Sequence, residues 1–199
     1  MFYKSFAFTF FCLFSFSSHA LKLRDFDQLQ IQIGTWLENY AQVQTTPEGD
    51  VNDGFAFTPL ISAGLTYKYK PQIQIIPEVG WVFQRTQENV SKNIFLFRND
   101  FAYVPKDWFK LRAGSSLIIT SISGDGGEET LNNGTTTESY FIPEQRRNAF
   151  NQTLDFGIEF LHKNASLRFQ TYFYAWNDSD ERMYTHAMSF NYFIPVKSL

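Results

Sequence analysis

Hydrophobic and polar residues alternate with a period of two along most of this chain. From Phe55 to Tyr69 the odd-numbered positions are apolar, aromatic or proline, and the even-numbered positions are mostly small or polar, with Leu60 as the exception. After a short break at residues 70–71, the same alternation continues to Gln84. A period of two is typical of a strand that has one apolar and one polar face. We therefore predict a tight hairpin of two long amphipathic strands in this part of the chain.

Six further segments repeat the alternation, which gives eight predicted strands in all. The six segments are Gln28–Tyr40, Asn93–Val104, Trp108–Ser121, Ala149–Leu161, Ala165–Trp176 and Met183–Pro195. One face of these strands is broad, aromatic and nearly free of charge, whereas the other is rich in Gly, Ser, Thr and charged residues. Segments of ~10 residues with this division are expected in a transmembrane β-barrel, whose apolar face meets lipid and whose polar face lines the interior.

The connections between the predicted strands differ in length in a regular way. They are short at residues 70–71, 105–107 and 162–164, and longer at 41–54, 87–92, 123–147 and 177–182. Bacterial outer-membrane barrels have short turns on the periplasmic side and longer loops outside. Closure of the barrel also pairs every backbone group, which an open sheet in lipid would not do. We therefore predict an all-β fold, an eight-stranded antiparallel transmembrane β-barrel with up-and-down meander topology and both termini on the periplasmic side.

The first twenty residues have a different character from the rest of the chain. Lys4 precedes a largely apolar run at residues 6–16, and Ser18-His19-Ala20 has the small-x-small form of a cleavage site. These are the features of a secretory signal peptide, and the apolar run is too short for a membrane anchor. We expect cleavage after Ala20 and Sec export to the bacterial outer membrane. Residues 1–20, which include Cys12, would then be removed, and residues 21–199 would form the barrel domain.

Composition narrows the class of protein further. Of the 199 residues, 44% are hydrophobic and 19% aromatic, which excludes a disordered chain. The net charge is -3, and no basic stripe is present that could follow a phosphate backbone, so we expect no binding to nucleic acid. The sequence contains no strong cofactor or metal motif, and we expect neither a cofactor nor a metal.

The pattern of strands and connections from Gln28 to Leu199 resembles the small outer-membrane barrels of the OmpA/OmpX type. Within it, Pro77-Glu-Val-Gly-Trp81 is similar to strands of that group. The resemblance implies a small closed barrel, which we expect to be monomeric. The chain departs from the group at its end, because such barrels commonly finish on an aromatic residue that is recognised during assembly. We expect Tyr192 or Phe193 to take that role here.

The polar face of the predicted strands carries most of their charged side chains. We predict an interior charge network made of Glu38, Lys68, Glu78, Arg98, Asp100, Lys110, Arg112, Asp155, Glu159 and Arg168. Lys70 lies on the same face, and the acids and bases nearly cancel. An eight-stranded barrel is just wide enough to be filled by side chains, and buried charges must be paired. We interpret the interior as a salt-bridged plug, with a narrow passive pore as the alternative.

Catalysis is not expected from the residues that remain after signal cleavage. The fold that the resemblance implies also occurs in enzymes, including lipid A deacylases and acyltransferases, which typically use His with Ser and a carboxylate. His186 and Ser189 are close in sequence, but residues three apart in a strand point to opposite faces. A serine nucleophile must lie within hydrogen-bond reach of its base. We therefore predict no catalytic residues, and keep a lipid-modifying enzyme as an alternative.

The long connections point outward and are acidic, which favours a structural or surface-interaction role. Loops 41–54 and 123–147 are the candidates for contact with an extracellular partner. Arg146 and Arg147, at the foot of the second loop, are candidates for binding lipopolysaccharide phosphates, and membrane lipid is the expected surrounding.

Aromatic residues near the strand ends predict two girdles at the membrane interfaces. They are Tyr67, Tyr69, Trp81, Tyr103, Trp108, Trp176, Tyr184 and Tyr192. If the two faces were inverted, the chain would instead be a secreted lipocalin-like barrel that binds a small ligand inside.

Overall fold

The computed structural model describes residues 25–44, 51–87, 90–132, 137–141, 143–177 and 183–198, and side chains at 38–44, 51–56, 84–90 and 129–141 are outside this description. Within these described segments ten strands form, followed by a short 3-10 turn, η2, at Val196–Ser198. The strands are β1 (Gln28–Gln44), β2 (Val51–Lys70), β3 (Ile73–Gln87), β4 (Val90–Lys106), β5 (Phe109–Gly124), β6 (Glu128–Asn132), β7 (Thr137–Phe141), β8 (Arg147–His162), β9 (Ala165–Tyr174) and β10 (Met183–Pro195).

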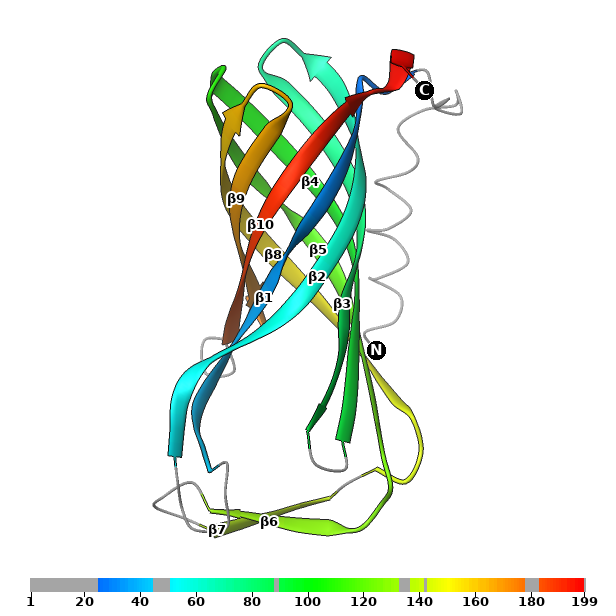
Figure 1. Ribbon diagram of the computed structural model, residues 1–199, viewed down its shortest axis with the longest axis vertical. Helices are drawn as coiled ribbons and strands as arrows, with labels where there is room; N and C mark the ends of the chain where they lie inside the picture. The colour runs from blue at the N-terminus through cyan, green and yellow to red at the C-terminus, as the bar shows by residue number, and fades with distance from the viewer. Residues whose placement is uncertain are drawn as a thin grey trace.

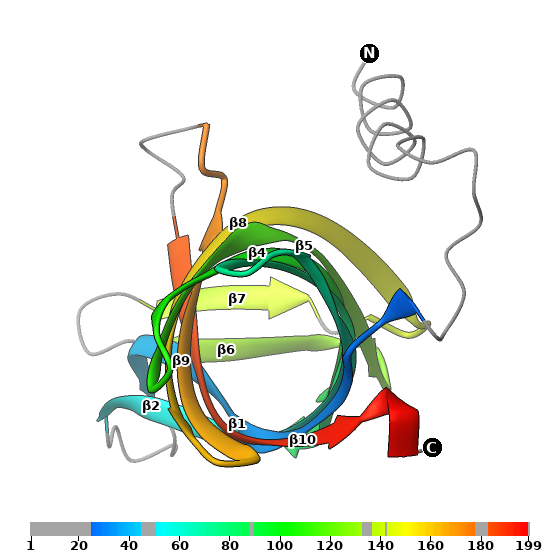
Figure 2. The same ribbon diagram turned by 90° about the horizontal axis from the view of Figure 1, so that it is seen from above.

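Eight of these strands close into a barrel. The order around the ring is β1-β10-β9-β8-β5-β4-β3-β2, and each neighbouring pair is antiparallel. Strand β1 closes the ring by pairing with β10 from Gln28↔Pro195 to Leu37↔His186. The closed ring is visible in Figure 2, along the barrel axis. The predicted eight-stranded meander, and with it the resemblance to small eight-stranded barrels, is confirmed.

The two ends of the barrel differ as the connection lengths predict. At one end, which we call the short-turn end, the connections 71–72, 107–108 and 163–164 are two residues long, and β1 begins and β10 finishes there. At the other end, the long-loop end, most strands are longer than the sequence predicts, whereas β10 begins at the predicted residue and β9 ends two residues before the predicted Trp176. Strands β1 and β2, for example, stay paired as far as Gln44↔Val51, well beyond the last β1–β10 pair (Figure 1).

A second small sheet corrects one sequence prediction. Residues 123–147 were expected to be an irregular loop, but β6 and β7 within it pair antiparallel from Glu128↔Phe141 to Asn132↔Thr137. This hairpin lies beyond the long-loop end and crosses the projected barrel axis (Figures 1 and 2). The two strands are short and polar, so no apolar alternation marks them. The Asn-Gly dipeptide between them in the sequence is the signal that fits a hairpin.

The two faces of the barrel wall have opposite polarity. Large hydrophobic side chains lie exposed on the outside of every barrel strand, among them Ile33 at 67%, Phe57 at 71% and Phe190 at 68% exposure. The polar residues of the same strands point inward, where Gln32, Ser62 and Asn191 are buried. This is the reverse of a water-soluble barrel, and it matches the expected exterior of a barrel in lipid.

Most of the predicted girdle aromatics lie exposed near the ends of the barrel wall. Tyr69, Tyr103, Trp108 and Tyr192 are near the short-turn end, Trp176 and Tyr184 are near the long-loop end, and Tyr67 and Trp81 are half-buried. Within the described segments, no helix combines the length and the hydropathy that a membrane span requires.

Candidate functional site

Eight of the ten predicted interior charges lie together inside the barrel. We call this set the charged layer: Glu78, Arg98, Asp100, Lys110, Arg112, Asp155, Glu159 and Arg168. Each is at most 7% exposed. They come from β3, β4, β5, β8 and β9, and they occupy the part of the interior nearer to the short-turn end. The four acids and four bases of this layer balance in formal charge.

Glu78 is the centre of the charged layer. It accepts hydrogen bonds from both terminal nitrogens of Arg168, at 3.0 and 3.2 Å, and from Arg98 and Ser62. A terminal nitrogen of Arg112 lies 3.7 Å away. Glu78 is on β3 and Arg168 on β9, which stand four places apart in the eight-strand ring and therefore face each other. This two-pronged ion pair thus spans the interior from wall to wall.

Arg112 joins two further carboxylates, those of Asp100 and Glu159, to this centre. Its Nε donates to Asp100 at 2.7 Å, and its Nη1 donates to Glu159 at 3.1 Å. Lys110 lies 3.5 Å from the same Glu159 carboxylate. Since removal of one partner would leave the others buried and unpaired, the network holds each member in a fixed position.

Asp155 is bound differently from the other carboxylates. It accepts one hydrogen bond from the Ser116 hydroxyl and one from the Gln170 side-chain amide, both at 2.6 Å. No Lys or Arg of the described residues lies within 4.0 Å of it. Neutral side chains also extend the network to the remaining strands, for example the Gln30 amide, which donates to Asn191 at 3.1 Å.

Glycine makes room for the charged layer where two strands face it closely. A Cβ added to Gly114 would stand 2.6 Å from Oδ1 of Asp100, and one added to Gly157 would overlap the Gln170 side chain. Real Cβ atoms do not approach other atoms so closely. These two glycines are therefore explained by the space that the polar side chains of neighbouring strands need.

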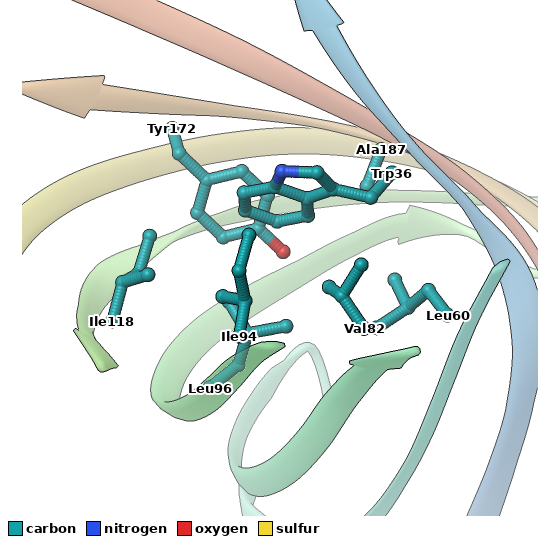
Figure 3. Packing of buried hydrophobic residues seen from close by; sticks show 8 residues of the cluster. All are labelled: Trp36, Leu60, Val82, Ile94, Leu96, Ile118, Tyr172 and Ala187. Carbon is teal, nitrogen blue, oxygen red and sulfur yellow. The ribbon is translucent and has the colours of Figure 1, made fainter. Parts of the chain in front are cut away.

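Toward the long-loop end, the described interior holds a cluster of apolar side chains, beside which Thr58, Thr153 and Thr185 are also buried. We call this set the apolar layer: Trp36, Leu60, Val82, Ile94, Leu96, Ile118, Tyr172 and Ala187. Figure 3 shows the ring of Trp36 lying over that of Tyr172 with the aliphatic side chains below, and the two ring centroids are 4.8 Å apart. All members are at most 5% exposed, so the apolar layer is as shielded from water as a soluble core.

Tyr172 connects the two layers. Its ring packs on Trp36, and its hydroxyl accepts a hydrogen bond from Arg98, whose guanidinium also lies 5.8 Å from the ring centroid. One side chain therefore belongs to the apolar layer by its ring and to the charged layer by its oxygen. This is the usual arrangement of a buried tyrosine, whose hydroxyl finds a partner.

The apolar layer corrects the prediction from the sequence that the interior is polar throughout. Leu60 was the only inward apolar residue noted as an exception. Val82, Leu96 and Ile118 occupy inward positions next to other apolar residues, so the strands lose their alternation there. That loss is itself the signal, because a run that is apolar on both faces indicates burial on both.

Two of the predicted network residues are not placed in the charged layer. Lys68 lies at the short-turn end, where its side chain is 49% exposed and its Nζ is 3.9 Å from Asp27. It stands at the end of β2, where the interior opens to solvent. Glu38 belongs to β1 beyond the last β1–β10 pair, and its side chain lies outside the described residues.

The other candidate residues are also placed. Arg146 and Arg147 are both exposed at the long-loop end, where β8 begins. Ser189 is 2% exposed in the interior, whereas the side chain of His186 is on the outer face and lies 3.0 Å from the Thr171 hydroxyl. The barrel wall separates this serine from this histidine, so the pair has no route to nucleophilic catalysis.

Comparison with solved structures finds barrels of similar architecture at low sequence identity. Ail of Yersinia pestis, in a complex with the heparin analogue sucrose octasulfate, has 11% identity and a TM-score of 0.46, with 84% of this chain and 99% of that chain covered. The N-terminal β-barrel domain of Pseudomonas aeruginosa OprF has 8% identity and a TM-score of 0.46, over 84% and 98%. Neisserial surface protein A has 10% identity and a TM-score of 0.43, over 84% and 96%.

No model of a known protein family matches this sequence, and no curated protein matches it.

Proposed function

We propose that this protein is a closed, non-conducting barrel of the bacterial outer membrane with a structural or surface-interaction role. The exposed aromatic and aliphatic exterior supports placement in lipid, since these side chains would otherwise face water. The separation of Ser189 from His186 by the barrel wall supports a protein that is not an enzyme of the type considered above. In this proposal the closed barrel has a structural role in the membrane, and the long-loop end is available for contacts at the cell surface.

The observation that carries this proposal is the filling of the interior across its width. The Glu78–Arg168 ion pair joins opposite walls. On the side of the long-loop end, Trp36, Ile118 and Tyr172 fill the interior with at most 1% exposure. Water-filled passage would require both the charged layer and the apolar layer to open, and an eight-stranded barrel has little spare width. A narrow passive pore is therefore the less favoured function.

The proposed orientation places the short-turn end in the periplasm and the long-loop end outside. This agrees with the asymmetry of outer-membrane barrels. The exposed Arg146 and Arg147 would then stand at the outer surface, within reach of lipopolysaccharide phosphates. The β6–β7 hairpin and the β1–β2 connection would be the surfaces open to an extracellular partner. Signal-peptide removal after Ala20, Sec export and a monomeric state belong to the same proposal.

The proposal is tested by combining gel mobility with protease access. We expect the membrane-fraction protein to migrate faster in detergent gels when it is not boiled, because a closed barrel resists unfolding by detergent. We also expect protease added to whole cells to cut within 41–54 or 123–147 and to leave the membrane-embedded parts of the barrel strands intact. A soluble periplasmic protein with no mobility shift would contradict placement in the membrane. Cleavage only after the outer membrane is permeabilised would contradict the orientation.

A further inference from the structure

The outer, lipid-facing wall of the barrel carries a groove that is separate from the filled interior. It has a volume of about 810 Å³, and its lining includes Phe101, Tyr103, Leu111, Ala113, Phe156 and Thr171. Ala113 and Thr171 are small outward-facing residues between larger aromatic ones, so the side chains project less from the barrel surface there. The groove is therefore an indentation in the lipid-facing surface, bordered by aromatic rings.

The course of the groove follows the pairing of the strands. Phe101 pairs with Ala113, Ala113 with Phe156, and Phe156 with Thr171. Thr171 is three residues from the long-loop end of β9, and Tyr103 is three residues from the short-turn end of β4. The groove thus runs obliquely along the wall, from β9 on the side of the long-loop end to β3 on the side of the short-turn end. Four inter-strand spacings of ~4.8 Å give it a length of ~19 Å, enough for an acyl chain.

Polar groups lie at the end of this apolar groove that is nearer to the long-loop end of the barrel. Thr171, which lines the groove, pairs with His186 on the neighbouring strand, and its hydroxyl is 3.0 Å from Nδ1 of that histidine. The ring of Tyr184 lies beside His186, with a centroid distance of 5.5 Å. An ionisable side chain on the lipid face of a membrane protein is costly, so such a residue points to a functional site.

We propose that this groove binds one acyl chain of an outer-leaflet glycolipid of the lipid A type, whose polar linkage is recognised by His186. The outer-leaflet placement rests on the orientation proposed above. When the Thr171 hydroxyl donates to Nδ1, the proton of the neutral ring lies on Nε2, which is then the donor toward lipid. The contact with Thr171 also orients the ring, so that Nε2 faces away from the strand pair.

The depth of the histidine selects the class of lipid. His186 is two residues deeper along β10 than the exposed Tyr184, whose ring marks the interface. At that depth the first carbons of the lipid chains begin. The amide-linked 3-hydroxyacyl chains of lipid A place a carbonyl and a hydroxyl there, whereas a glycerophospholipid places only esters. A histidine N–H with an adjacent threonine hydroxyl matches the first arrangement better.

Lipid binding to the barrel purified from membranes in mild detergent tests this proposal. Native mass spectrometry would compare added lipid A with added phosphatidylethanolamine. Ala113→Phe fills the floor of the groove, and His186→Leu removes the polar recognition. Ala63→Phe is the matched control, because Ala63 is an exposed outward residue of β2 that does not line the groove. The gel-mobility shift of each variant reports independently whether the barrel itself has formed.

We expect the unaltered barrel to retain one lipid A in preference to phosphatidylethanolamine. Ala113→Phe and His186→Leu should each weaken this binding about tenfold, and Ala63→Phe should leave it unchanged. Equal binding by the Ala113→Phe variant would overturn the groove as the site. Equal retention of phosphatidylethanolamine would overturn the choice of lipid, and unchanged affinity in the His186→Leu variant would overturn the role of the histidine. A normal mobility shift in all variants would leave the proposed closed barrel intact in each case.

Discussion

The charged layer and the apolar layer fill one narrow interior by opposite means. In the charged layer, Glu78 holds Arg98 and Arg168 through directional hydrogen bonds, and each group depends on a partner from another strand. In the apolar layer, Ile118 and its neighbours are held by apolar packing, which has no directional requirement. Loss of a group therefore leaves an unpaired charge in one layer and a small cavity in the other. The interior is thus closed in two ways: by a hydrogen-bonded network that depends on each partner, and by an apolar core that tolerates changes of side-chain shape.

The largest effect is expected when the centre of the charged layer loses its charge. Glu78→Gln keeps the size of the side chain but leaves buried arginines without their shared carboxylate. We expect a loss of about 3–5 kcal/mol in the free energy of unfolding. Urea unfolding in lipid vesicles, followed by the gel-mobility shift, would measure it. Glu144→Gln, at an exposed position, is the control, and an equal loss in both variants would contradict a special role for Glu78.

A somewhat smaller loss is expected in the apolar layer. Ile118→Ala removes a fully buried side chain and should cost about 2–4 kcal/mol in the same unfolding measurement. Ile118→Leu should cost less than about 1.5 kcal/mol, because a core tolerates a change of shape at constant volume. Ile119→Ala, next to it on the opposite face, is the matched control. If Ile118→Leu proved as damaging as Ile118→Ala, the apolar layer would not be the tolerant half.

The junction of the two layers separates packing from hydrogen bonding. Tyr172→Phe preserves the ring contact with Trp36 and removes only the acceptor of the Arg98 hydrogen bond. We expect a loss of about 1–3 kcal/mol, since a buried donor is left without its partner. The exposed Tyr184→Phe should change the unfolding free energy little. A neutral result for Tyr172→Phe would show that Arg98 is satisfied by its carboxylate partners alone.

The smallest effect is expected outside both layers. Lys68→Ala breaks a 3.9 Å ion pair with Asp27 in which both side chains are well exposed. Such pairs contribute less than about 1 kcal/mol, so unfolding should hardly change. A loss as large as that of Glu78→Gln would place Lys68 in the interior network after all.

The barrel could be predicted from the sequence because apolar and polar residues alternate with a period of two along most of each wall strand. Strand Met183–Pro195 was predicted with the bounds that the structure has, and eight strands with short and long connections were sufficient to predict closure. The long-loop ends of the strands were less predictable. Strands β1 and β2 stay paired well past the last β1–β10 pair, as a two-stranded ribbon that the sequence pattern did not predict.

The candidate site was predictable in its members but not in its arrangement. Inward position and charge are properties of the sequence, and these place Glu78 and Arg168 on the interior face. Their meeting across the barrel depends on the stagger of opposite strands, which no local pattern contains. The outer groove was also out of reach, because it arises where small residues of separate strands, such as Ala113 and Thr171, come into register.

Electrical recording from the purified protein in a planar lipid bilayer tests the central claim most directly. Both layers must open for ions to pass, because the Glu78–Arg168 pair spans the interior and the apolar layer lies in series with it. We therefore predict no steady conductance from inserted barrels whose gel-mobility shift shows that they are folded. A steady, voltage-independent conductance from such barrels would contradict the account and would make the protein a pore.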